Sequence, residues 1–158
     1  MLAGPRDKEV ALLATLNRHF HQVVPLNRAL GIEVVELLDG EARMRLPYSP
    51  DLVGNPETGV LHGGAISAIM DACCGCAVFM KLSRPVAIAT LDLRIDYLRP
   101  AAPGRDVVAH ATCYRITKHV AFVRAVAYLD DESDPLASAT GTFMLGTAPG
   151  KTSGKATP

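Results

Sequence analysis

The spacing of apolar residues near the start of the chain predicts a short amphipathic helix between Arg6 and His21. Asn17 and Arg18 fall on the opposite, polar face of this helix. A further turn over residues 27–30 is expected to end at Gly31, because glycine readily takes the left-handed conformation that closes a helix. The chain should therefore begin with two short helical pieces.

The apolar pattern then changes to one that is typical of strands. Two apolar-rich runs, Ile32–Leu38 and Glu41–Leu46, flank Asp39-Gly40, a dipeptide that supplies the positive φ angles of a two-residue hairpin. Residues 47–59 are rich in Pro and Gly and are expected to form a loop. Later segments alternate with a period of two and predict four more strands, over 90–97, 107–114, 120–129 and 136–145.

The longest apolar segment, from about His62 to Lys81, predicts the one long helix of the chain. A membrane span needs about 20 mostly apolar residues. This segment, however, carries two glycines and Asp71 near its centre, so we interpret it as a buried core helix and expect no membrane partner. Ala and Gly recur on one face of the last three strands, which would let this helix approach closely. The sequence thus predicts an α+β fold, with five or six antiparallel strands wrapped around one central helix.

Length and composition fit a single globular domain of 158 residues, with 49% hydrophobic and 20% charged residues. Sixteen basic residues balance sixteen acidic ones, which argues against nucleic-acid binding. We expect residues 1–31 to form an N-terminal helical segment, 32–146 the folded domain and 147–158 a disordered tail. The mixed charges and short apolar run at the N-terminus do not resemble a signal peptide.

Three of the four cysteines, Cys73, Cys74 and Cys76, crowd into the predicted long helix, and Cys113 lies in a later strand. Near neighbours on one helix do not have the converging Cβ atoms that a disulfide needs. No Cys/His pair follows at the spacing of a zinc site, so we expect no metal. We interpret the thiols as small, reduced, buried hydrophobic groups, which suits a cytoplasmic protein.

Asp71 is the only charged carboxylate between His62 and Lys81. A buried carboxylate without partners costs several kcal/mol, so Asp71 either has a fixed structural partner or carries chemistry. At the start of the same helix, the amides of Gly63 and Gly64 lack intrahelical partners and could polarise a carbonyl group. The alternative is a flexible joint between loop and helix. His62 is likewise either a base or a structural residue.

Gly63 and Asp71 lie eight residues apart, which is about 12 Å along a helix that rises 1.5 Å per residue. One helix therefore cannot easily bring both groups to one carbonyl group. Two antiparallel helices related by a two-fold axis can do so, with the amides of one subunit facing Asp71 of the other. The spacing predicts a homodimer with shared active sites.

The run Gly59–Ala65, the aspartate at Asp71 and the later run Thr90–Ala101 with its Leu-Arg-Pro ending resemble the hotdog-fold thioesterase superfamily. Within it, the chain is most similar to the phenylacetate-pathway acyl-CoA thioesterases, over roughly Ile32–Leu145. The resemblance implies hydrolysis of an acyl-coenzyme A substrate without an added cofactor. It also implies subunits that join their sheets edge to edge and assemble further into a homotetramer.

The resemblance also implies roles for individual residues. The amide of Gly63 or Gly64 would donate to the thioester carbonyl, and Asp71 of the other subunit would activate water or attack the thioester carbon directly. Thr90 resembles a hydroxyl that helps hold the water, and Asn55 resembles a loop amide that contacts the carbonyl. Basic residues at strand ends are candidates for the coenzyme A phosphates, namely Arg99, Lys118, Arg115 and His119.

Two alternatives use the same pocket. A hydratase or dehydratase of acyl thioesters would need a histidine paired with an acid to move a proton at the acyl chain, and His62 is the histidine nearest in sequence to Asp71. A non-catalytic acyl-CoA-binding module would bind without turnover. Release of the thiol from acyl-CoA separates hydrolysis from both.

Overall fold

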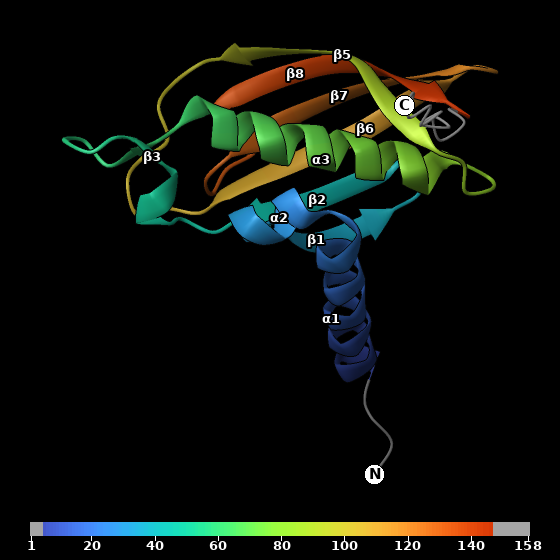
Figure 1. The fold of residues 1–158 in the computed structure, drawn as a ribbon, viewed down its shortest axis with the longest axis horizontal. Coiled ribbons are helices and arrows are strands. Elements are labelled where there is room, and N and C mark those ends of the chain that lie inside the picture. The colour runs from blue at the N-terminus through green and yellow to red at the C-terminus, as the bar shows by residue number, and fades with distance from the viewer. Residues whose placement is uncertain (1–4, 147–158) are drawn as a thin grey trace, which may run out of the picture.

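A computed structural model describes residues 5–146, with side chains from residue 14 onward (Figure 1). One antiparallel sheet with the strand order β1-β2-β6-β7-β8-β5 packs against the long helix α3 (Gly63–Lys81). The predicted α+β architecture is confirmed, whereas the tail predicted over 147–158 lies outside the described residues. The strands of this sheet are β1 (Glu33–Leu38), β2 (Glu41–Leu46), β5 (Ile88–Tyr97), β6 (Val107–Ile116), β7 (Val120–Tyr128) and β8 (Ala137–Leu145).

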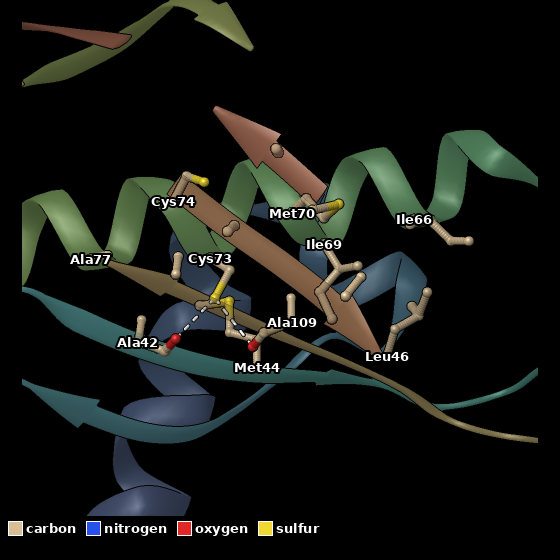
Figure 2. Packing of buried hydrophobic residues seen from close by; sticks show 14 of the residues in the cluster. Ala42, Met44, Leu46, Ile66, Ile69, Met70, Cys73, Cys74, Ala77 and Ala109 are labelled. Atoms are coloured by element: carbon tan, nitrogen blue, oxygen red, sulfur yellow. Dashed lines mark hydrogen bonds between the residues drawn. The ribbon is translucent and has the colours of Figure 1, made fainter. Parts of the chain in front are cut away.

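The inner face of α3 packs on β2, β6 and β7. Ile69, Met70 and Cys73 are fully buried there, and the Cys73 thiol donates to the carbonyl oxygens of Ala42 and Ala109 at 3.2 and 3.4 Å (Figure 2). The sheet beneath is built from small residues, as predicted, which allows a helix to approach its strands closely. The buried alanines of the last three strands are Ala109, Ala111, Ala121, Ala125, Ala127, Ala137 and Ala139.

The outer face of α3 differs from the prediction of all-round burial. Phe79 and Met80 remain 46% and 38% exposed, and Asp71 is half-buried. Among the described helices, α3 alone is long and apolar enough to cross a membrane, but its inner face forms the core of the sheet. The apolar residues of α3 thus serve two surfaces, one in the core and one facing outward.

The N-terminal helices α1 (Pro5–Val23) and α2 (Pro25–Leu30) form as predicted, and Gly31 ends α2 with a φ of 69°. The polar face of α1 that carries Asn17 contacts the edge of the sheet. The Asn17 side-chain amide donates to the carbonyl oxygen of Val34 at 3.0 Å and accepts from the Val34 amide at 2.6 Å. One turn later, His21 Nε2 donates to the carbonyl oxygen of Ile32 at 2.6 Å. These polar groups of α1 cover the backbone along the β1 edge of the sheet.

Two further expectations need correction. Only Gly40 has a positive φ in the β1–β2 turn, at 72°, so Asp39 does not share the left-handed conformation. The predicted loop over 47–59 contains a 3-10 turn (Pro50–Leu52) and a small hairpin of β3 (Val53–Asn55) and β4 (Val60–Leu61). Strands of two or three residues are too short to show a readable alternation, so the sequence pattern did not predict them.

The four cysteines are free thiols. Cys73, Cys74 and Cys113 are buried and Cys76 is half-buried, in line with the expected structural role. Burial raises the pKa of Cys74 and of Cys76 to about 12 and raises the pKa of Cys73 as well. Because the thiolate is the reactive form, these thiols are poor nucleophiles at neutral pH.

Candidate active site

The central pair of the site is Asp71 on α3 and Thr90 on β5. The Thr90 hydroxyl donates to Asp71 Oδ1 at 2.9 Å. The pairing of β5 with β8 shifts by one residue between Thr90 and Asp92, and such a bulge re-aims the side chains around it. Within the described chain no hydrogen bond reaches Asp71 Oδ2, so that oxygen is available to a water or a substrate.

Asp71 and Thr90 line a cavity of about 650 Å³ on the outer side of α3. Its other walls come mostly from apolar side chains of α1, α2, α3 and β5. A pocket of this size suits a small molecule, for which the typical range is about 300–1,000 Å³. The arrangement combines an apolar chamber with a carboxylate and a hydroxyl at one position in its wall.

The first turn of α3 is held by its N-cap residue, His62. The imidazole Nδ1 of His62 accepts a hydrogen bond from the Gly64 amide at 2.9 Å, which leaves the ring proton of neutral His62 on Nε2. The Gly64 amide is therefore occupied, while the Gly63 amide has no partner among the described residues. Of the two predicted donors, Gly63 is the one free to meet a carbonyl oxygen.

Two hydroxyl groups that the sequence analysis did not single out also bind this turn. Tyr97 of β5 donates to the carbonyl oxygen of Gly63 at 2.8 Å, and Ser67 Oγ lies 2.6 Å from the Tyr97 hydroxyl. Ser67 follows Gly63 by one helical turn, but Tyr97 follows it by 34 residues. The only sign of this contact in the sequence was a tyrosine, with its hydroxyl group, at the end of the predicted strand 90–97.

The glycine turn and Asp71 do not meet within one protomer. His62 and Gly64 line a second cavity, of about 390 Å³, which Asp71 does not reach. This separation agrees with the spacing along α3 and leaves each half of the predicted site incomplete.

Asn55 lies in the β3–β4 hairpin, which extends from the body of the molecule near the start of α3 (Figure 1). Its side-chain oxygen accepts a hydrogen bond from the Glu57 amide at 3.0 Å, and its carbonyl oxygen accepts one from the Gly59 amide at 2.8 Å. In the described chain Asn55 therefore stabilises its own turn and is not brought to Asp71.

The predicted phosphate-binding residues lie at opposite ends of β5. Arg99 follows the end of β5 and forms an ion pair with Asp134 at 2.8 Å. The exposed basic residues around the β6–β7 turn are Arg115, Lys118 and His119. This turn lies near the start of β5, because the His119 carbonyl oxygen accepts a hydrogen bond from the amide of Leu145, which pairs with Ile88 of β5. The three basic residues of this turn form one group, and Arg99 stands apart from it.

Comparisons with known proteins agree with this fold. Residues 58–135 match the family model described as "Thioesterase superfamily". The chain is 34% identical, over 78% of its length and 86% of the relative, to the medium/long-chain acyl-CoA thioesterase YigI of Escherichia coli.

Solved structures show the same likeness. A crystal structure of a Pseudomonas aeruginosa protein superimposes with a TM-score of 0.74 at 44% identity, covering 84% of this chain and 98% of that one. A variant of the phenylacetic acid degradation protein PaaI from Thermus thermophilus superimposes with a TM-score of 0.67 at 27% identity, covering 77% and 98%. The long helix packed on a six-stranded sheet and these matches lead to one assignment. The chain belongs to the thioesterase superfamily and is a thioester hydrolase with the hotdog fold.

Proposed function

We propose that this protein hydrolyses acyl-coenzyme A thioesters to a free acid and coenzyme A, with Asp71 as the catalytic carboxylate. The observation that carries the proposal is the Asp71–Thr90 hydrogen bond in the wall of a largely apolar cavity. The similarity to YigI, which is named for medium- and long-chain acyl-CoA, supports coenzyme A as the leaving group.

The chemistry follows from the two oxygens of Asp71. Thr90 orients the carboxylate through Oδ1, and Oδ2 is placed to take a proton from water or to attack the thioester carbon. Attack places negative charge on the carbonyl oxygen, which the free amide of Gly63 at the positive end of α3 would stabilise. Breaking the C–S bond then releases coenzyme A, whose sulfur takes up the proton removed from water. If Asp71 attacks directly, coenzyme A leaves first and water then hydrolyses the acyl–aspartyl anhydride to the free acid.

The complete site requires a second copy of the chain. Asp71 lies eight residues beyond Gly63 on α3, about 12 Å along the helix, so the amide that meets a given Asp71 would come from its neighbour. β5 is an edge strand that exposes Leu91 at 51%, and Leu98, directly after the strand, is 56% exposed. An unpaired edge of this kind favours strand pairing with another copy, and a homotetramer would be a dimer of such dimers.

The geometry favours hydrolysis over the hydratase alternative. A hydratase would need a histidine paired with the acid, but His62 Nδ1 is engaged by the Gly64 amide and His62 does not line the Asp71 cavity. His19 does line that cavity, but among the described residues the hydrogen-bond partner of Asp71 is Thr90 and not a histidine. The free thiols fit a reducing compartment, and we propose a cytoplasmic location.

A thiol-release assay with straight-chain acyl-CoA substrates tests the proposal. We expect multiple turnovers with one free coenzyme A released per thioester. Stoichiometric binding without release would contradict hydrolysis and favour a binding module, and addition of water to an enoyl-CoA would favour the hydratase.

A further inference from the structure

We infer that the last two turns of α1 form one wall of the acyl-chain site and that this wall, together with the outer face of α3, selects straight acyl chains of about ten carbons. The inference rests on the proposed function, because it takes the thioester carbon to lie at Asp71. The match to the family model begins at residue 58 and so does not include α1.

The first argument is the composition of the cavity. Leu16 and Phe20 of α1 and Cys76 and Phe79 of α3 line the cavity that also contains Asp71. Among the described residues that line it, the titratable side chains are His19, Asp71 and the high-pKa thiol of Cys76. A groove with mostly apolar walls and a carboxylate at the reactive position suits a molecule with a hydrocarbon tail.

The second argument is length. Cys76 and Met80 follow Asp71 by five and nine residues on α3, which places them roughly 8 and 14 Å along the helix. An extended acyl chain advances roughly 1.3 Å per carbon, because C–C bonds of about 1.5 Å zigzag at tetrahedral angles. The groove between Asp71 and Met80 therefore matches about ten carbons, with Cys76 beside about the sixth.

The third argument is that α1 is fixed in position. Asn17 and His21 hydrogen-bond to the backbone of Val34 and Ile32, and they alternate along α1 with the groove residues Leu16 and Phe20. The same helix thus binds the sheet edge with its polar side chains and presents apolar ones to the groove. Phe79 and Met80, which would be covered by a bound chain, are large apolar residues left exposed.

The test is the ratio of kcat/KM for decanoyl-CoA to that for butyryl-CoA. Cys76→Phe fills the groove halfway along, and we expect the ratio to fall by about tenfold or more, since one methylene in an apolar pocket already changes discrimination by about 10–200-fold. Phe20→Ala removes part of the wall and is expected to lower the same ratio severalfold, which keeps the test valid if Cys76→Phe fails to fold. Leu38→Phe adds an aromatic ring at an exposed position outside the groove and serves as the matched control.

An unchanged ratio in folded Cys76→Phe and Phe20→Ala would overturn the inference while leaving acyl-CoA hydrolysis intact. Dissociation of the oligomer by Phe20→Ala with an unchanged ratio would also overturn it, because the groove would then be an interface between copies. Absence of hydrolysis in the parent protein would instead reject the proposed function. The two failures are therefore distinguishable.

Discussion

The hydroxyl group of Tyr97 donates to the carbonyl oxygen of Gly63 at 2.8 Å and so ties the end of the edge strand β5 to the first turn of α3. Ser67 Oγ lies 2.6 Å from the Tyr97 oxygen and 3.1 Å from the same carbonyl oxygen. Both hydroxyl groups are thus placed to donate to the Gly63 carbonyl oxygen and lie within hydrogen-bonding distance of one another. These contacts orient the glycine pair, a residue type with wide conformational freedom.

Replacing Tyr97 with Phe should therefore lower kcat more than it changes KM. Loss of the hydrogen bond should also reduce the free energy of unfolding by about 1 kcal/mol. Steady-state kinetics and urea unfolding measure the two effects separately. Tyr114→Phe is a suitable control, because Tyr114 is an exposed tyrosine of β6 that packs against Phe122 and Arg124. Equal kinetics for Tyr97→Phe and the parent protein would argue against a positioning role.

Gly64→Ala should be destabilising even though alanine is the better helix former. A Cβ atom at Gly64 would lie 2.9 Å from His62 Nδ1 and would displace the ring from the amide that it caps. Losing an N-cap costs about 0.5–2 kcal/mol.

Gly75→Ala in the middle of α3 is the matched comparison. A Cβ atom there would meet Phe143 Cε1 at 3.6 Å, an ordinary contact, so helix propensity should stabilise the protein by roughly 0.5–1 kcal/mol. Thermal unfolding of both variants tests the opposite signs. A gain in stability for Gly64→Ala would contradict the capping role of His62.

The buried thiols predict a loss of stability at alkaline pH. The pKa of Cys74 rises from 9.0 to about 12 on burial, so the folded state holds this proton more tightly than the unfolded state does. The resulting stabilisation is fully present below pH 9 and is lost as the pH rises from 9 toward 12. Urea midpoints between pH 8 and 10.5 should fall more steeply for the parent protein than for Cys74→Ala. Parallel curves would show that Cys74 does not contribute.

Lys118 at the β6–β7 turn is expected to interact with the phosphates of coenzyme A. Lys118→Ala should raise KM for an acyl-CoA severalfold, and added salt should reduce the difference, because exposed charge pairs are screened. The same acyl group on N-acetylcysteamine, which lacks the phosphates, should show no such change. Lys81, which pairs with Asp39 at 2.9 Å, offers a control lysine. An equal loss with both thioesters would exclude phosphate recognition.

Periodicity sufficed to predict the long elements. The two-residue alternation over 90–97 and the apolar run after His62 correspond to β5 and α3, and the Ala-rich faces correctly indicated where the helix packs. Asp71 could be predicted as a site residue because burying a single carboxylate in an apolar helix is costly unless it has a partner or a chemical role. Thr90 was predicted as a site residue only from the family resemblance. In the structure its hydroxyl oxygen lies 2.9 Å from Asp71 Oδ1.

Other features depend on tertiary contacts that local patterns do not encode. The sequence around Asn17 does not show that its side chain will bond to Val34 of β1. Tyr97 and Gly63, which also bond to each other, are 34 residues apart in the chain. The outer face of α3 is as apolar as its inner face, so composition alone could not separate the core from the groove at Phe79 and Met80.

The most direct test of the account is the turnover number of Asp71→Asn. Asparagine keeps a side-chain oxygen for the Thr90 hydroxyl but can neither take a proton from water nor attack the thioester, so the fold should persist. We expect kcat for acyl-CoA hydrolysis to fall by about 10²–10⁴-fold, the usual contribution of such a group. Activity of Asp71→Asn within a few fold of the parent protein, in a variant with unchanged unfolding behaviour, would contradict the assignment of Asp71 as the catalytic carboxylate.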